Sequence, residues 1–275
     1  EASLACGMIR NFGSMAGHLH AGNAARNGIE AGFLAQKGFT AHEDIIEAPY
    51  GYYNTFTGNP EMLSKEIQAA HSQALGRPWN LINPGLMFKA YPCAHISAFG
   101  VTAGLELRKE HNIDWRQISE IELRIPTIID KMVHYNDPTT GIEAKFSPGY
   151  CLCRALIEGE IKISHFADEN INDPATRQLM QAIRLVVLEQ EQQVGSFGYQ
   201  EVVLKMKNGT VYSCKVEHAK GDPQNPQTDE EFTGKYLSCA EYAHYDRETA
   251  LQIQEMVTGL ERLTDVSALT ELLGK

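Results

Sequence analysis

The sequence predicts an α+β protein in which helical segments flank an insert of mixed helices and strands. Residues 1–83 are rich in small and apolar residues at helical spacing, and residues 223–275 show helical patterns again. Between them, residues 84–222 combine helix signals with runs that alternate between apolar and polar residues, as strands do. Because helices bury their apolar faces against one another, we expect the two flanking segments to form one domain, which the insert interrupts.

The composition is that of a globular protein and disfavours several kinds of partner. Hydrophobic residues make up 43% of the 275 positions and charged residues 21%, which are ordinary values for a folded chain. The formal net charge of −11 disfavours binding to nucleic acids or anionic membranes, but a few local cations in a cleft would still attract an anionic substrate. The sequence shows no apolar run of membrane-spanning length and no signal-peptide pattern. We therefore expect a cytoplasmic protein with no nucleic-acid or membrane partner.

The six cysteines do not form a ligand pattern for a metal or an iron–sulfur cluster. No pair has the C-x-x-C spacing, and Cys151 and Cys153 fall in a stretch of helical character, where their side chains would point to different faces. Reduced, buried or half-buried thiols are the expected state of these residues. The sequence predicts no bound metal.

The first helical segment is expected to begin with a long helix over residues 20–37, which small and apolar residues dominate and which Gly38 ends. Thr40 and Glu43 have the spacing of a capping box, which predicts a short helix that ends before Pro49.

Changes of composition predict the domain boundaries. Residues 60–75 have helical spacing, and Gly76, Pro78 and Pro84 then interrupt the helical pattern. We place one boundary near residue 84 and a second near Asp222, in the linker-like sequence GDPQNPQ.

Helix caps, proline positions, apolar–polar alternation and a hairpin turn predict the remaining elements. In order, these are a helix at 95–110, a half-buried strand at 118–126, a helix from Ser147 to Gly159, a helix from Asp173 to about residue 183, two strands joined by Asn208-Gly209, a helix capped by Thr228 and Glu231, and one or two helices at 246–273.

Two histidines, His18 and His20, stand at or just before the start of the helix predicted at 20–37. The free backbone N–H groups and the positive end of the helix dipole favour a bound carboxylate at such a position. Paired histidines at a helix start are more often structural than catalytic, and no third ligand accompanies them to form a metal site. Both interpretations stay open on these residues alone.

Lys89 lies between apolar residues in the sequence FKAYPCAHIS, which also contains His95. A half-buried lysine near a helix start would bind a substrate carboxylate as a point charge. The alternative is a lysine whose stem lies along apolar surface while its ammonium stays in water. Tyr150, in the first turn of its predicted helix, also has two interpretations, because its hydroxyl would bind either a ligand or a core carbonyl.

Five blocks of sequence, in order and at sensible spacing, resemble successive blocks of the MmgE/PrpD family. They are GSM…LHAGNAARNGIEAGFLAQKGFTA, PGLMFKAYPC, KFSPGYCLCRALIEGEI, INDPATRQLM and GDPQNPQTDEEFTGKYLSCA. The resemblance extends over essentially the whole chain. The family includes 2-methylcitrate dehydratase, cis-aconitate decarboxylase and, more distantly, an iminodisuccinate epimerase.

The resemblance implies an all-helical main domain interrupted by a smaller α+β lid domain, an active site between the domains, a dimer, and no metal or organic cofactor. It also implies that His20 transfers a proton or hydrogen-bonds the substrate, that Tyr150 donates a hydroxyl hydrogen bond, and that Lys89 binds a carboxylate. His18 and His95, which lie close to these positions in the sequence, are assigned to substrate binding as well.

Two departures from the family pattern bear on activity. Gly17 stands where the family usually carries a lysine, three residues before His20. Loss of that cation is expected to weaken substrate binding unless His18 or an arginine substitutes. The chain is also expected to lack the family's N-terminal helical segment, which carries an aspartate and a histidine of the active site. Another polypeptide would then supply it, or the chain is a fragment or has no catalysis of its own.

The implied function is that of a cofactor-free lyase, a dehydratase or decarboxylase, acting on a di- or tricarboxylate such as 2-methylcitrate or cis-aconitate. One alternative is an isomerase or epimerase of a related acid, and another is a catalytically inactive partner subunit. Residues 1–80 are expected to expose an apolar face that a few helices cannot cover, so a second copy or the N-terminal helical segment should bury it.

Overall fold

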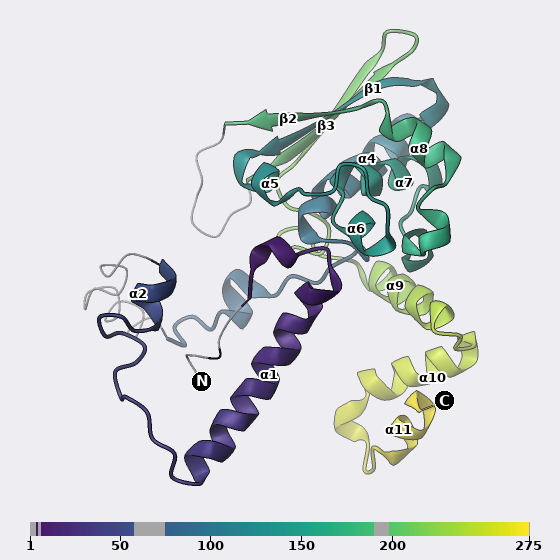
Figure 1. Ribbon diagram of the computed structural model, residues 1–275. Coiled ribbons are helices and arrows are strands. Elements are labelled where there is room, and N and C mark those ends of the chain that lie inside the picture. Colours follow the sequence, from purple (N-terminus) through teal and green to yellow (C-terminus); the bar gives the residue numbers. More distant parts are fainter. Residues whose placement is uncertain (1–3, 5–6, 58–74, 190–197, 275) are drawn as a thin grey trace. The chain divides into compact units, whose positions relative to one another are not determined.

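The computed structural model describes residue 4 and residues 7–57, 75–189 and 198–274 (Figure 1). The chain divides into two compact units, Glu1–Leu86 and Met87–Lys275. The helix predicted at 60–75 lies outside the described residues except at its last position. The described part mixes helices with one sheet, as the predicted α+β class requires, while the three-part division and the lid stay predictions.

The first unit contains the long predicted helix, α1 (Met15–Gln36), which begins five residues earlier than expected. It follows a short 3₁₀ helix, η2 (Ile9–Asn11), and is followed by Gly38 with a φ of 84°. The other described elements of this unit are α2 (Tyr52–Thr57) and the π-helical turn η4 (Leu81–Gly85).

The short helix predicted from Thr40 and Glu43 is wrong, because residues 43–51 form turns. The Ala48 N–H donates to the Asp44 carbonyl at 2.9 Å, which closes a single turn. Pro49 then has no N–H to continue a helical ladder, and Tyr50 takes a left-handed φ of 65°.

Gly17 allows α1 to pack closely against the turn that precedes it. A Cβ atom at this position would lie 2.6 Å from the backbone oxygen of Asn11, whereas a Cβ at Gly22 on the same helix would have no atom within 4 Å. The absence of a side chain at Gly17 is therefore a packing requirement of this arrangement.

The second unit is built on a four-stranded sheet in the order β2-β1-β3-β4 (Figure 1). The strands are β1 (Ile118–Pro126), β2 (Ile183–Leu188), β3 (Gln200–Met206) and β4 (Val211–Val216). The predicted strand at 118–126 and the hairpin are confirmed, and Gly209 has the expected positive φ of 87°. The sequence did not predict β2, which pairs parallel with β1 and begins at Ile183, where the helix observed as α8 (Pro174–Met180) was expected to end.

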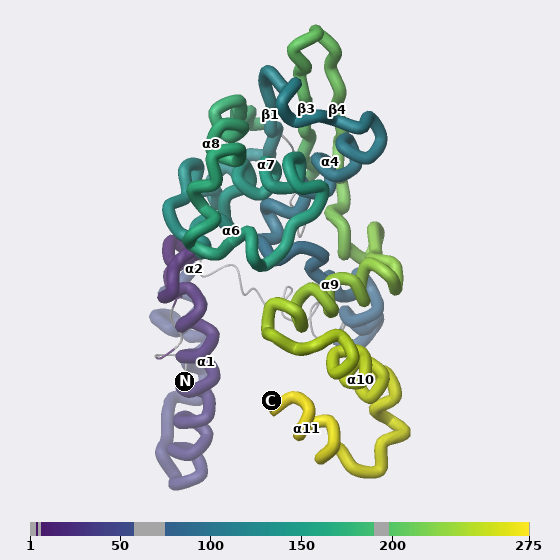
Figure 2. Tube along the Cα trace, turned by 90° about the vertical axis from the view of Figure 1, so that its right-hand side faces the viewer, coloured from purple at the N-terminus to yellow at the C-terminus, as the bar shows by residue number. Residues whose placement is uncertain are grey.

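Two predicted helices, α4 (His95–His111) and α7 (Pro148–Glu158), pack against each other, and α4 packs on β3 and β4 (Figures 1 and 2). A Cβ at Gly104 would lie 2.6 Å from a methyl carbon of Leu152, so the glycine lets the two helices approach closely. The core between helices and sheet is mainly apolar and includes Leu107, Ile121, Leu123, Leu152, Leu156 and Leu204.

Helix α7 is capped as predicted. The Ser147 side chain accepts from the Tyr150 N–H at 3.3 Å, and Gly159 ends the helix with a φ of 77°. Cys151 and Cys153 are fully buried in two different apolar clusters, which confirms that they point to different faces. Two short helices, α5 (Thr127–Met132) and α6 (Gly141–Lys145), were not predicted.

The last helices are α9 (Asp229–Tyr242), α10 (Arg247–Thr258) and α11 (Ser267–Leu273). The capping box is confirmed, since Glu231 and Thr228 exchange hydrogen bonds at 2.8 and 3.2 Å. The Tyr236 hydroxyl donates to the Ala250 carbonyl at 2.7 Å and ties α9 to α10. In the part of the chain that the structure describes, no helix has the length and apolarity needed to cross a membrane.

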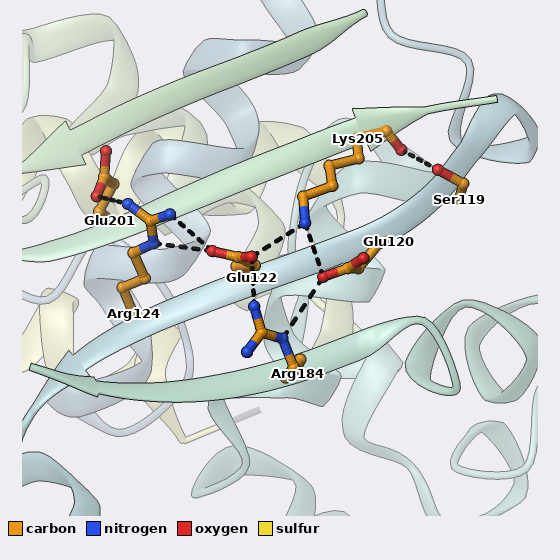
Figure 3. Close-up of polar contacts among 7 residues, drawn as sticks. All are labelled: Ser119, Glu120, Glu122, Arg124, Arg184, Glu201 and Lys205. Carbon is orange, nitrogen blue, oxygen red and sulfur yellow. Dashed lines mark hydrogen bonds and ion pairs between the residues drawn. The ribbon is translucent and has the colours of Figure 1, made fainter. Parts of the chain in front are cut away.

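A network of charged residues covers the face of the sheet that carries the polar residues of β1 (Figure 3). The alternation of buried and exposed side chains predicted for β1 does not hold at Glu122, whose side chain should be exposed but is buried, with only 6% of the residue exposed. Three cations surround it, at 2.7 Å for Arg124, 2.5 Å for Arg184 and 3.1 Å for Lys205. Hydrogen bonds from Arg124 and then Lys205 lower the pKa of Glu122 to about 2.

Replacement of Glu122 by glutamine should destabilise the protein at neutral pH, because it leaves three cations without their shared carboxylate. The folded-state pKa is lower than the ordinary value of 4.5, so the stabilisation is present above pH 4.5 and is lost as the pH falls toward 2. We expect a loss of roughly 1–3 kcal/mol at pH 7, measured by urea denaturation, and a smaller difference from the wild type at pH 3. The exposed Glu169→Gln variant is the control and should leave stability unchanged at both pH values.

Two glycine substitutions on α1 should have opposite effects. Gly22→Ala adds a methyl group in open space and should stabilise the protein by about 0.5–1 kcal/mol through helix propensity. Gly17→Ala gains the same propensity but places its Cβ against the Asn11 carbonyl, so it should lower the melting temperature. Equal shifts of the two melting temperatures would show that the contact at Gly17 does not constrain the helix.

Candidate functional site

Lys89 and His95 lie close together in the second unit. Residues 87–92, here called the strap, have no regular secondary structure and lead into α4, whose first residue is His95. Lys89 is exposed, and among the described residues no carboxylate lies within ion-pairing distance of its ammonium. Its positive charge acts on His95. These two predicted substrate-binding residues are therefore electrostatically coupled.

The protonation of His95 is set by its surroundings. Burial is the main reason why the pKa of His95 lies below its ordinary value, the charge of Lys89 lowers it further, and Asp222 opposes the shift. The imidazole packs edge-on against the Phe99 ring, with the centroids 5.2 Å apart. A neutral imidazole both donates and accepts hydrogen bonds, which suits it to bind a polar substrate.

The strap is fixed from the side of the β4–α9 loop. The Phe88 N–H donates to the Gly221 carbonyl at 2.9 Å, and the Gln227 amide donates to the Phe88 carbonyl at 3.1 Å. The Lys235 ammonium donates to the Lys89 carbonyl. The sequence GDPQNPQ, predicted to be a linker, thus packs against Phe88 through both its first and its last residue.

Tyr150 does not share a surface with Lys89. It is fully buried, and its hydroxyl donates to the His165 carbonyl at 2.5 Å. Burial raises the pKa of Tyr150 to about 12. Of the two interpretations of this hydroxyl, the structure shows the bond to a core carbonyl, and the catalytic role of Tyr150 stays a prediction.

His18 and His20 belong to the first unit and lie inside α1 rather than at its start, since the helix begins at Met15. The His18 ring is exposed and bonds the Ser14 carbonyl at 3.2 Å. The His20 ring is half-buried and lies 3.4 Å from the Asn11 amide nitrogen. At Gly17, the Cβ of any other residue would lie 2.6 Å from the backbone oxygen of Asn11, so a lysine here would require this turn to move.

Behind the strap lies a cleft of about 440 Å³ that the sequence did not predict. It is lined by Tyr91, Leu105, Lys162, Lys220, Lys235 and Cys239, among others. Burial raises the pKa of Tyr91 to about 12, so its phenol stays protonated near neutral pH. The lining residues come from distant parts of the sequence, which is why no motif indicated them.

No metal centre is evident in this part of the protein. Across the described ranges, no three His, Cys, Asp or Glu side chains are grouped closely enough to hold a metal ion.

Comparison with known proteins identifies the family. Residues 1–64 match the MmgE/PrpD N-terminal domain, and residues 91–262 match the MmgE/PrpD C-terminal domain.

Curated relatives include three cis-aconitate decarboxylases. The chain is 27% identical to that of Mus musculus over 274 residues, which are 96% of this chain and 54% of the relative. It is 28% identical to that of Homo sapiens over 93% of this chain and 52% of the relative. It is 27% identical to that of Aspergillus terreus over 98% of this chain and 57% of the relative. The chain spans about half the length of these relatives, and with both of the family's domains matched it belongs to the MmgE/PrpD family.

Proposed function

We propose that the protein containing this chain is a lyase that removes CO₂ from a tricarboxylate such as cis-aconitate. The observation that carries the proposal is the similarity to three cis-aconitate decarboxylases over 93–98% of the chain. Dehydration of a related acid such as 2-methylcitrate is the neighbouring reaction within the same proposal. Epimerisation, which shares only proton abstraction next to a carboxylate, is a less favoured alternative.

Such a decarboxylation requires cationic groups that bind the carboxylates and a group that supplies one proton. The tricarboxylate loses CO₂ as one C–C bond breaks, and the electron pair left behind takes up one proton, at that carbon or at the far end of the adjoining alkene, so its charge changes from −3 to −2. Lys89 is suited to hold a carboxylate, because its ammonium is exposed and has no competing carboxylate among the described residues. His95 in its neutral form would donate a hydrogen bond to the substrate. Proton transfer by His20 is what the resemblance to the family implies. The proposal involves no cofactor.

A catalytically inactive partner subunit is the second candidate, and two observations favour it. Gly17 leaves no room for the family's lysine in this packing, and the Tyr150 hydroxyl is bonded to a core carbonyl rather than exposed. Both features would weaken a substrate site that depended on those groups.

An activity assay separates these candidates. With cis-aconitate, a decarboxylase should release trapped CO₂ in equal amount to the acid consumed, whereas dehydration of 2-methylcitrate should give new alkene absorbance without CO₂. Lys89→Met should raise KM roughly tenfold or more through the lost charged hydrogen bond, with folding unchanged by circular dichroism. The exposed Lys131→Met on α5 is the matched control. No turnover of either acid by the full-length protein would favour the inactive partner, and an unchanged KM in Lys89→Met would remove Lys89 from the site.

The proposal includes a homodimer. Helix α1 exposes Leu19, Ile29 and Phe33, each 59–64% accessible, and apolar surface of this kind often marks an interaction site. Sedimentation equilibrium should give twice the monomer mass, and Phe33→Glu should shift the protein toward the monomer. A monomer at micromolar concentration would contradict this part of the proposal.

A further inference from the structure

The contacts of the strap are unusual because a charged side chain binds a neutral backbone oxygen. Lys235 of α9 donates its ammonium hydrogen bond to the Lys89 carbonyl. The two other lysines of the same cleft each bind a carboxylate, Lys162 with Glu160 at 2.7 Å and Lys220 with Glu231 at 2.8 Å. Among the described residues, Lys235 has no such acidic partner.

We infer that Lys235 is a positioning residue, which fixes the backbone of Lys89 and thereby directs its ammonium to the substrate carboxylate. The inference rests on the proposed function of Lys89. In this scheme Lys235 acts through the Lys89 carbonyl and makes no contact of its own with the substrate.

The strap depends on these contacts because it has no ladder of its own. Residues 87–92 lie outside any helix or strand, so their backbone groups need partners from other elements. The Phe88 N–H donates to Gly221, and the Phe88 carbonyl accepts from Gln227. The Lys89 carbonyl accepts from Lys235. A hydrogen bond from a charged donor is stronger than one between neutral groups, so Lys235 is the principal constraint on the Lys89 peptide unit.

The β4–α9 loop and the first turns of α9, which make these contacts, are themselves well fixed. Gly221 has a φ of 93°, and a Cβ there would lie 1.8 Å from the Phe88 oxygen, so only glycine permits the approach. The Phe232 ring of α9 meets the Phe88 ring edge-on at 6.0 Å. The capping box at Thr228 fixes the start of α9, two turns before Lys235. Lys235 is therefore presented from a defined position rather than from a free surface.

The test combines amide exchange with kinetics in the full-length protein. In Lys235→Met, hydrogen exchange of residues 87–92, followed by mass spectrometry, should accelerate. KM for cis-aconitate should rise about threefold to tenfold, which is the effect of losing part of a charged hydrogen bond, while kcat stays within about twofold. Lys235→Arg keeps a charged donor and should restore the wild-type amide exchange rate and the wild-type KM. Lys162→Met, in the same cleft but paired with Glu160, is the matched control and should change neither.

A double-mutant comparison separates positioning from a general structural role. If Lys235 acts through Lys89, Lys235→Met should have no further effect on KM in a Lys89→Met background. Additive losses, a fall in kcat at constant KM, or unchanged amide exchange would each overturn the inference. If Lys89→Met alone leaves KM unchanged, the proposed function of Lys89 fails and the positioning role fails with it. If Lys89→Met raises KM but Lys235→Met does not, the positioning role alone is wrong.

Discussion

The burial of α4 between α7 and the sheet is the constraint on which the second unit depends. Gly104 brings the α4 backbone against Leu152, and a Cβ at Gly100 would already touch Leu123 of β1 at 3.4 Å. Larger side chains at these positions would push the helix away from its neighbours. Because α4 begins at His95, a fixed helix axis also fixes the point where the strap joins the core. Lys89 is thus connected to the rigid part of the unit through only a few residues.

The cationic side chains of this acidic chain have two kinds of partner, a carboxylate or a neutral backbone carbonyl. On the sheet, the carboxylate of Glu122 is shared by three cations, so the network neutralises itself and contributes mainly to stability. Around the strap, the Lys89 carbonyl accepts a hydrogen bond from the Lys235 ammonium, and this neutral oxygen does not cancel the charge of Lys235. Lys89 itself has no carboxylate partner among the described residues, so a local excess of positive charge remains at its ammonium in a chain of net charge −11. Such an excess favours the approach of a polycarboxylate, which the rest of the surface repels.

Local sequence signals correctly predicted the features that depend on contacts between residues close together in the sequence. The caps at Ser147 and Thr228 and the Asn208-Gly209 turn were confirmed because each depends on neighbours within four residues. The capping box at Thr40 was wrong because Pro49 and the left-handed Tyr50 end the turn. The strand β2 and the burial of Glu122 were missed, since both depend on pairing across more than sixty residues. In the site, Lys89 and His95 were predictable as neighbours in the sequence, whereas Lys235 and Tyr91 meet only after folding.

The buried thiols of α7 have a chemical consequence. Burial raises the pKa of both Cys151 and Cys153 well above the ordinary value, and burial, followed by the hydrogen bond with Glu106, raises that of Cys214 on β4 to about 12. The thiolate is the nucleophilic form of cysteine, so these three residues stay in the unreactive form at neutral pH. An alkene conjugated to a carboxylate, as in cis-aconitate, is an electrophile toward thiolates. If the proposed activity on such an acid holds, the same apolar packing that holds α7 in place would protect the core from alkylation.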